Sequence, residues 1–260
     1  MSTPLINLLQ VNQLTKHFEV PVTGGWINRS ASLRAVDGIS FNLNEGRTLG
    51  LVGESGCGKT TAARLVLGLM KPTAGSIVFE GHEISATRNA EWRSTRKRMQ
   101  MVYQNPLGAL DRRLKVIDQV TEPLKIHQIE DARTQIEKAQ NLLGELGLSS
   151  THWHRYPHEL SGGQRQALTL LMGVMDKTDI LLMDEPTAAL DPKSSQVVMQ
   201  LADKINKELG ITIVLVTHSM KDALHYGNRL LMFHAGALLR DLNGMDKSQL
   251  QLSNLQEWFN

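Results

Sequence analysis

The chain has 260 residues, 41% of them hydrophobic, which is enough to bury a large core without the help of disulfides. Its formal net charge of +2 is too small to indicate a nucleic-acid partner, and its single cysteine, Cys57, excludes an internal disulfide and fits a reducing compartment. No run approaches the roughly 20 apolar residues of a membrane-spanning helix and the first residues do not resemble a secretion signal, so we expect a soluble, cytoplasmic chain.

The N-terminal part of the chain predicts short strands separated by turn residues. These strands cover residues 8–14, 35–43, 47–53 and 75–81. The polar stretch from Val20 to Leu33 predicts an exposed loop or a hairpin insertion between the first two strands. Apolar residues at helical spacing predict a helix over 60–70.

The rest of the chain alternates between helical and strand patterns. A predicted strand over 99–104 ends at Gln104, and from Asn105 to about Gly173 the pattern is mostly helical. Short apolar runs then follow at 179–185, 210–218 and 229–236. This rhythm is typical of a mostly parallel sheet flanked by helices. We expect one α/β domain, with a core from residues 1–104 and 174–245, a helical subdomain from 105–173 and a short amphipathic helix over 246–260.

Residues 53–60 fit the phosphate-binding pattern G-x-x-x-x-G-K-[ST], and they lie between a predicted strand and a predicted helix. Without β-carbons, Gly56 and Gly58 let backbone N–H groups turn toward phosphates at the helix N-terminus. Lys59 offers a positive charge to the β- and γ-phosphate oxygens, and the Thr60 hydroxyl can ligate Mg²⁺. The alternative is an ordinary glycine-rich turn, which the Lys-Thr pair and the flanking pattern disfavour.

An acidic pair follows the apolar run of residues 180–183. A buried strand here delivers Asp184 and Glu185 at its carboxyl end, where ligands of open α/β sheets bind. Asp184 is placed to hold Mg²⁺, and Glu185 to orient or deprotonate an attacking water. The alternative is that the pair caps the next helix; beside a phosphate-binding loop we favour the catalytic interpretation.

The stretch "LSGGQRQ", residues 160–166, predicts a second anion site. Ser161 and two glycines precede a helical run, so backbone N–H groups at a helix N-terminus are again available. Two phosphate cradles and a single predicted Mg²⁺ site in one chain require an explanation.

That explanation comes from a resemblance to the ATP-binding cassette (ABC) family over most of the chain. The matching segments occur in the family's order: Phe18 as the aromatic that stacks on adenine, Gly53–Thr61 as the P-loop, Gln104 as the Q-loop glutamine, Leu160–Gln164 as the signature, Asp184–Glu185 as the Walker B pair, Ala189–Asp191 as the D-loop and His218 as the switch histidine. The resemblance implies an α/β fold with a P-loop NTPase core, an antiparallel β lobe and a helical signature subdomain.

The resemblance also implies a site shared between two subunits, because in this family the P-loop of one subunit and the signature of the other enclose each ATP. Glu185 would be the catalytic base, His218 would contact the γ-phosphate, and Gln104 would sense Mg²⁺ and the attacking water. Thr60, Gln104 and Asp184 are the expected metal ligands. The expected nucleotide contacts are Phe18, Gly53, Glu54, Ser55, Gly56, Cys57, Gly58, Lys59, Thr60, Thr61, Ser161, Gly162, Gly163, Gln164 and Asp191.

An isolated cassette resembles the ATPase subunit of a bacterial import system, peripheral to the cytoplasmic side of the inner membrane. Its expected partners are ATP, integral-membrane permeases, a second ATPase subunit in a homo- or heterodimer and, indirectly, a substrate-binding protein, with no nucleic acid. Residues 8–166 resemble the dipeptide, oligopeptide and nickel group, whereas residues 167–260 look more like amino-acid uptake ATPases. A di- or oligopeptide is the favoured cargo, with an amino acid or nickel as alternatives. The alternative function is a soluble ABC-type ATPase that remodels a protein or nucleoprotein complex.

Overall fold

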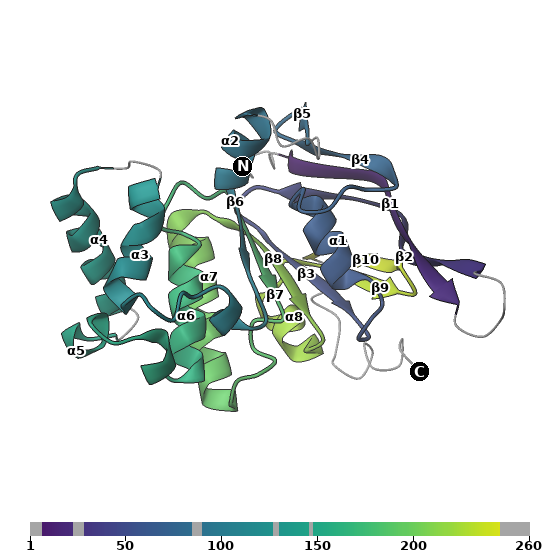
Figure 1. Ribbon diagram of the computed structural model, residues 1–260. Helices are drawn as coiled ribbons and strands as arrows, with labels where there is room; N and C mark the ends of the chain where they lie inside the picture. The colour runs from purple at the N-terminus through teal and green to yellow at the C-terminus, as the bar shows by residue number, and fades with distance from the viewer. Residues whose placement is uncertain (1–6, 23–28, 85–89, 127–129, 146–147, 245–260) are drawn as a thin grey trace. The chain divides into compact units, whose positions relative to one another are not determined.

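The computed structural model describes residues 7–22, 29–84, 90–126, 130–145 and 148–244 (Figure 1). The chain divides into two compact units, one from residues 1–96 and 215–260 and the other from residues 97–214. The predicted C-terminal helix over 246–260 lies outside the described residues. None of the described helices has both the length and the apolar character that a membrane crossing demands.

An antiparallel sheet occupies the N-terminal part of the first unit, as the sequence predicts. Its order is β2-β1-β4-β5, with β1 at Asn7–Val22, β2 at Arg29–Asn44, β4 at Ala74–Phe79 and β5 at His82–Glu83. β1 and β2 pair as far as Val22 opposite Arg29, so much of the predicted 20–33 insertion is the far end of a long hairpin. Residues 23–28, in the middle of this predicted insertion, lie outside the described residues. Where Val11 faces Phe41, both side chains are buried, and this anchors the hairpin at its base.

The first unit also contains part of the α/β core. Its strands are β3 (Thr48–Gly53), β9 (Arg229–His234) and β10 (Ala237–Leu242), and its helices are α1 (Lys59–Val66), α2 (Ala90–Lys97, which ends at the unit boundary) and α8 (Met220–Tyr226). β3 is parallel to β9, and β10 is antiparallel to β9. Every residue of β3 is buried, and Val52 packs in one cluster with Ala223 of α8 and Met232 of β9.

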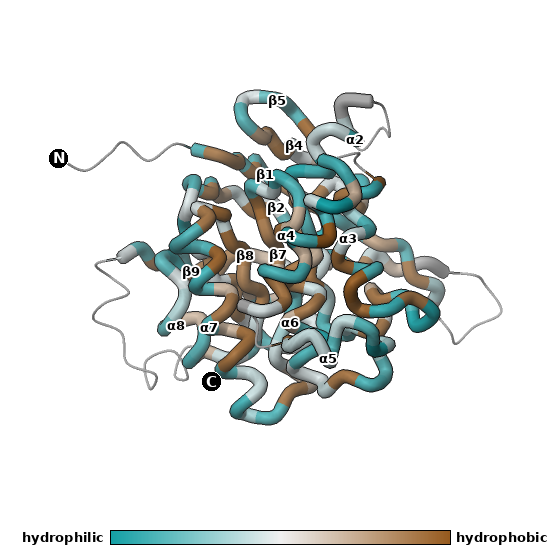
Figure 2. Tube along the Cα trace, turned by 90° about the vertical axis from the view of Figure 1, so that its left-hand side faces the viewer, coloured by the Kyte–Doolittle hydropathy of each residue, from teal (hydrophilic) through white to brown (hydrophobic). Residues whose placement is uncertain are grey.

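The second unit combines parallel strands with a helical part. Its elements are β6 (Met99–Val102), η1 (Pro106–Gly108), α3 (Val116–Ile126), α4 (Ala132–Glu145), α5 (Ser150–Trp153), η2 (Pro157–Glu159), α6 (Gly162–Met172), β7 (Ile180–Asp184) and α7 (Pro192–Leu209), followed by β8 (Thr212–Thr217), which begins in this unit. β6 and β7 pair in parallel from Met99 opposite Ile180 to Val102 opposite Met183. All residues of β8 are buried, and the tube in Figure 2 is brown along this strand. The α/β fold class expected from the sequence is confirmed.

The helices of the second unit enclose a core of their own. Val120 and Leu124 of α3, Leu143 of α4, and Leu168 and Leu171 of α6 belong to one buried cluster. The helical spacing of these residues places them on one face of each helix, which explains why the sequence over 105–173 has an amphipathic pattern. The boundaries of the predicted subdomains stay a prediction.

Two elements end earlier than the sequence predicts. α1 stops at Val66 rather than near residue 70, because Gly68 adopts a positive φ of 63°, which a helix cannot continue through. β6 stops at Val102 rather than at Gln104, because its pairing with β7 ends where Val102 faces Met183. Gln104 therefore belongs to the segment after the strand and not to the strand itself.

Candidate functional site

The P-loop runs from the end of β3 to the first turn of α1 and holds its lysine inward. Lys59 is 4% exposed, and its Nζ donates hydrogen bonds to the carbonyl oxygens of Gly53 at 2.8 Å and Glu54 at 2.7 Å. Glu54 and Ser55 are exposed, whereas Thr60 and Thr61 are half-buried in the first helical turn. No acidic side chain occurs in that turn, so the N-terminal end of α1 keeps its positive potential. The loop thus combines a helix N-terminus with a fixed ammonium group, which suits a bound phosphate.

Neighbouring backbone fixes the position of this loop. Gly58 has a φ of 108°, and a Cβ on it would lie 2.1 Å from the carbonyl oxygen of Ala35 in β2. The carbonyl oxygen of Cys57 accepts a hydrogen bond of 2.9 Å from the N–H of Gly236, in the turn between β9 and β10. Only glycine fits at position 58, because the left-handed φ and the contact with Ala35 both exclude a side chain.

Cys57 and Phe18 are two further expected nucleotide contacts in the same unit. The Cys57 side chain is half-buried, and its Sγ lies 2.7 Å from where a Cβ on Gly53 would be. This close packing agrees with a small residue that fills the loop. Phe18 lies on β1 and is half-buried, with the Lys16 ammonium 5.2 Å from its ring centroid. Two contacts hold the Lys16 ammonium: the face of the Phe18 ring, and the carbonyl oxygen of Lys71, which accepts a hydrogen bond from Lys16 Nζ at 2.9 Å.

His218 is another expected site residue in the first unit. It directly follows β8, is exposed, and precedes the helix cap Ser219, whose side chain accepts a hydrogen bond from the N–H of Asp222. The local sequence therefore places an imidazole at the carboxyl end of a buried strand, which is where the sheets of α/β proteins bind ligands.

In the second unit, Gln104 and the acidic pair come together at the carboxyl ends of the parallel strands β6 and β7. Gln104 Nε2 lies 3.5 Å from Glu185 Oε2. Asp184, the last residue of β7, is 6% exposed, whereas Glu185 is half-buried. The two carboxylates therefore have different environments, with only the second open to water.

Glu185 has a strained backbone. Its φ is 47°, a left-handed conformation that costs a residue with a Cβ about 1 kcal/mol or more. Its carbonyl oxygen accepts a hydrogen bond from Ala188 N at 3.2 Å, which helps to hold the turn. The sharp turn redirects the side chain after the buried strand. We infer that this conformation is kept because it places the Glu185 side chain, and not because it stabilises the fold.

The signature segment forms the N-terminal end of α6. Ser161 is the N-cap: its side chain accepts a hydrogen bond from Gln164 N at 3.2 Å, and its own N–H donates to Gln164 Oε1 at 2.9 Å. Gly163 lies so close to α7 that a Cβ on it would be 2.7 Å from the Ser194 Cβ. A cavity of about 410 Å³ opens beside this end of α6, with Ser161, Gly163, Gln164, Lys193 and Ser194 among its lining residues. A Cβ on Gly162 would meet only the tip of the Leu190 side chain.

Asp191 has a structural role that the sequence analysis did not assign to it. Its side chain caps α7 by accepting a hydrogen bond from Ser194 N at 3.0 Å, and hydrogen bonds from Ser194 hold the pKa of this carboxyl below its usual range. The Asp-Pro pair at the start of α7 is a helix-start signal that was visible in the sequence. Lys193 and Ser194 were missed as lining residues, because their proximity to the signature depends on the packing of two helices.

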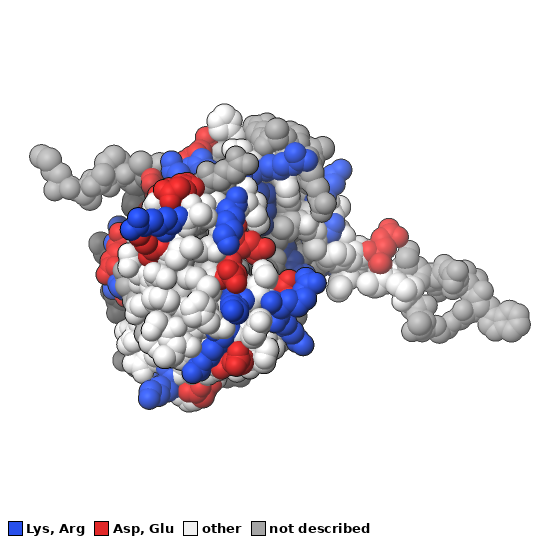
Figure 3. All heavy atoms as spheres, turned by 60° about the vertical axis from the view of Figure 1, so that its left-hand side comes forward, with Lys and Arg blue, Asp and Glu red and all other residues white. Residues whose placement is uncertain are grey.

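On the face that Figure 3 shows, the charged side chains of the described residues are not grouped by sign. Lys and Arg side chains on this face are interspersed with Asp and Glu.

The expected site residues divide between the two units. The first unit contains Phe18, the P-loop and His218, and the second contains Gln104, the acidic pair, the signature and Asp191. Oxygen ligands of the kind that Mg²⁺ prefers are present in Thr60, Gln104 and Asp184.

Comparisons with known proteins agree with this arrangement. A family model described as "ABC transporter" matches residues 36–188. An oligopeptide transport ATP-binding protein of Bacillus subtilis is 36% identical over 234 residues, which are 89% of this chain and 70% of that protein. A dipeptide transport ATP-binding protein of Escherichia coli is 36% identical over 229 residues, 88% of this chain and 68% of that protein.

A solved structure described as a dimeric, post-hydrolysis state of an ATP-binding cassette bound to ADP and Pi is similar with a TM-score of 0.78 and 26% identity, covering 91% of this chain and 99% of that one. This chain spans about two thirds of the length of the curated relatives, from 65% to 70%. These two alignments cover 234 and 229 residues, more than the first 166 residues of this chain could supply. The similarity to peptide-transport proteins therefore continues beyond residue 166.

Proposed function

Because this chain belongs to the ABC transporter family, we propose that it hydrolyses ATP to power an importer through separate membrane permeases. The observation that carries the ATPase proposal is the position of Gln104 and Glu185, 3.5 Å apart at the carboxyl ends of two parallel strands. A buried Asp184 directly precedes Glu185, so one end of the sheet offers a metal ligand, a base and an amide. In-line attack of water on a phosphoryl group requires these groups.

The proposed residues fit Mg²⁺ through their donor atoms. Asp184 supplies a carboxylate and Thr60 a hydroxyl, and Gln104 keeps its Oε1 for a cation because Nε2 faces Glu185. A Mg²⁺ ion held by these residues would offset the negative charge of the phosphates. Asp184, with little exposure to water, holds its carboxylate ready without losing many water contacts on binding.

The remaining chemistry is positioning and proton transfer. Lys59 holds the phosphates against the N-terminus of α1, and Phe18 supports the adenine ring. Gln104 orients the attacking water, and Glu185 accepts a proton from it. The water oxygen forms a bond to the γ-phosphorus while the bond from that phosphorus to the β,γ-bridging oxygen breaks, so ADP leaves with the bridging oxygen. His218 donates a hydrogen bond to a γ-phosphate oxygen, where negative charge is held in the transition state.

Two helix N-termini in one chain support a shared site. Ser161, Gly162, Gly163 and Gln164 at the start of α6 would close over the γ-phosphate that the P-loop of a second subunit holds. The dimeric solved cassette with ADP and Pi agrees with such an assembly. ATP then bridges two subunits, so binding favours closure and hydrolysis permits opening.

The relatives support a peptide as cargo. Their printed names describe oligopeptide and dipeptide transport ATP-binding proteins, so we propose a di- or oligopeptide importer, with amino acids or nickel as alternative cargoes. The subunit would lie peripherally at the cytoplasmic side of the cell membrane, and a substrate-binding protein would act indirectly.

The test is to purify the tagged chain from membranes of its source cells and to identify its partners by mass spectrometry. We expect multi-span permeases, and peptide-stimulated ATP hydrolysis when these and the binding protein are reconstituted together. Recovery without any membrane protein, with ATPase activity stimulated by DNA or ribosomes, would instead favour a soluble ATPase that remodels a protein or nucleoprotein complex.

A further inference from the structure

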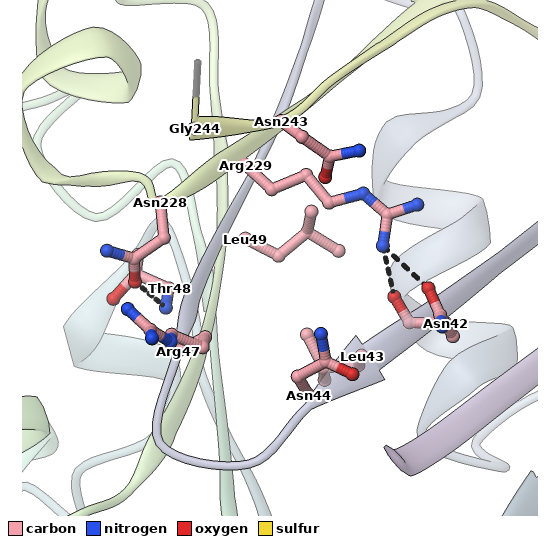
Figure 4. Close-up of a pocket in the computed structure, with 10 residues that line it drawn as sticks. All are labelled: Asn42, Leu43, Asn44, Arg47, Thr48, Leu49, Asn228, Arg229, Asn243 and Gly244. Carbon is pink, nitrogen blue, oxygen red and sulfur yellow. Dashed lines mark hydrogen bonds between the residues drawn. The ribbon is translucent and has the colours of Figure 1, made fainter. Parts of the chain in front are cut away.

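A cavity of about 460 Å³ lies in the first unit, away from the proposed phosphate site (Figure 4). Its lining includes Thr48 and Leu49 at the amino end of β3 and Arg229 at the amino end of β9. The P-loop instead follows the carboxyl end of β3. Six strand residues at about 3.3 Å each separate the two ends by roughly 20 Å. The volume is within the range of small-molecule sites, about 300–1,000 Å³.

One arginine of the cavity is already neutralised. Arg229 Nε donates to Asp241 Oδ1 at 2.6 Å, and Arg229 Nη1 donates to the backbone oxygen of Asn42 at 2.8 Å and to Asn42 Oδ1 at 2.7 Å. Figure 4 shows the Arg229 guanidinium directed toward Asn42 on one side of the cavity. Arg229 therefore forms part of the cavity wall, and its bonds to Asp241 and Asn42 leave little of its positive charge for a ligand.

The opposite side offers donors that are not used. Asn228 is held in place because its Oδ1 accepts a hydrogen bond from Thr48 N at 2.7 Å, and this leaves its Nδ2 as a donor. Arg47, drawn beside Asn228 in Figure 4, makes no hydrogen bond or ion pair with any residue that the structure describes. The amides of Asn44 and Asn243 add further donors, and no carboxylate occurs among the described lining residues.

The floor of the cavity is apolar. Leu43 and Leu49 both line it and are each 2% exposed, so only the edge of each side chain meets the cavity. A planar guanidinium and an amide N–H are matched to the two oxygens of a carboxylate, whereas the leucines favour hydrocarbon. We propose that this cavity binds a small organic carboxylate with an apolar tail. This proposal does not rest on the proposed ATPase function.

The test is a chemical-shift titration of the isotope-labelled full chain at fixed ionic strength, with isovalerate as the probe. We expect saturable shifts in the side-chain amide signals of Asn228 and Asn44. Inorganic phosphate, which has the charge without the tail, and isoamyl alcohol, which has the tail without the charge, should bind at least tenfold more weakly. Equal binding of phosphate, or no saturable shift with isovalerate, would overturn the proposal.

Two variants examine the residues themselves. Arg47→Gln removes the cation, and Asn228→Asp keeps the oxygen that accepts from Thr48 but replaces the donor with a negative charge. Each should weaken isovalerate binding about tenfold or more, since a hydrogen bond to a charged group is lost. Arg112→Gln is the matched control, because Arg112 is exposed and lies in the second unit; the same loss in this variant would contradict the assignment.

ATP binding measured on the same samples separates the two proposals. We expect it to be unchanged in Arg47→Gln and Asn228→Asp, which also shows that both variants fold. Failure of the wild-type chain to bind ATP would contradict the proposed function alone, because the isovalerate titration reports on a different site.

Discussion

The close contact between Gly163 of α6 and Ser194 of α7 allows the effect of Gly163→Ala on stability to be predicted. A Cβ on Gly163 would lie 2.7 Å from the Ser194 Cβ and 2.8 Å from its Oγ, well inside normal carbon contact. Forcing a methyl group into such a space costs about 1–3 kcal/mol. Replacing glycine by alanine within a helix returns at most about 1 kcal/mol. We therefore expect Gly163→Ala to lower the free energy of unfolding by about 1–2 kcal/mol.

The neighbouring glycine provides a matched control. A Cβ on Gly162 would meet only Leu190 Cδ2, at 3.2 Å, and this atom ends a flexible side chain that can turn aside. Gly162→Ala should leave the free energy of unfolding unchanged or raise it by up to about 1 kcal/mol. Equal destabilisation by both alanines would point to a general effect at this end of α6.

A second substitution should rescue the first. In Ser194→Gly the Cβ and Oγ are absent, and the nearest of the Ser194 contacts becomes its Cα at 3.5 Å, an ordinary contact distance. We expect Gly163→Ala to cost at least about 1 kcal/mol less in this background, measured by urea unfolding of all four chains of the double-mutant cycle. If the cost is the same in both backgrounds, the reasoning from the Gly163 contact is refuted.

Three further predictions concern the proposed catalytic residues and the cap of α7. Glu185→Gln should retain ATP binding but lose at least about a hundredfold in turnover, because the amide cannot accept a proton; turnover at the wild-type rate would exclude Glu185 as the base. Lys59→Ala should raise the dissociation constant for ATP at least about tenfold, as measured by fluorescent-nucleotide titration, since a charge-assisted contact is lost; an unchanged constant would contradict its role. Hydrogen bonds from Ser194 lower the pKa of Asp191 in the folded chain, so its stabilisation is present above the ordinary Asp pKa of about 3.9 and is lost as the pH falls through the lowered value. The advantage of the wild type over Asp191→Asn in urea unfolding should therefore shrink from pH 6 to pH 3, and an advantage that is independent of pH would exclude this linkage.

Local patterns predicted the parts of the fold that depend on neighbours in sequence. The apolar run before Asp184 predicted a buried strand, and β7 is buried over its whole length. The Gly-Lys-Thr sequence predicted the start of a helix, and α1 begins at Lys59. Each of these signals is contained within a few residues, so a single sequence is enough to detect it.

Features that depend on packing between distant segments were not predicted. The sequence placed Gln104 and Glu185 at the ends of two strands, but it did not show that those strands are neighbours, which makes the 3.5 Å contact possible. The need for glycine at 163 comes from Ser194 on another helix. The free donors around Arg47 depend on which side chains the fold has already paired, and no spacing rule reports that.

At Glu185, the left-handed backbone means that the residue best for fold stability differs from the residue that the proposed chemistry requires. Glycine or asparagine adopts a φ of 47° at less cost than glutamate does, so either should strengthen the fold while removing the proposed base. Laboratory evolution for heat resistance alone, with no demand for turnover, would then be expected to replace Glu185 early. Retention of glutamate there under such selection would mean that the turn is less costly than its geometry indicates.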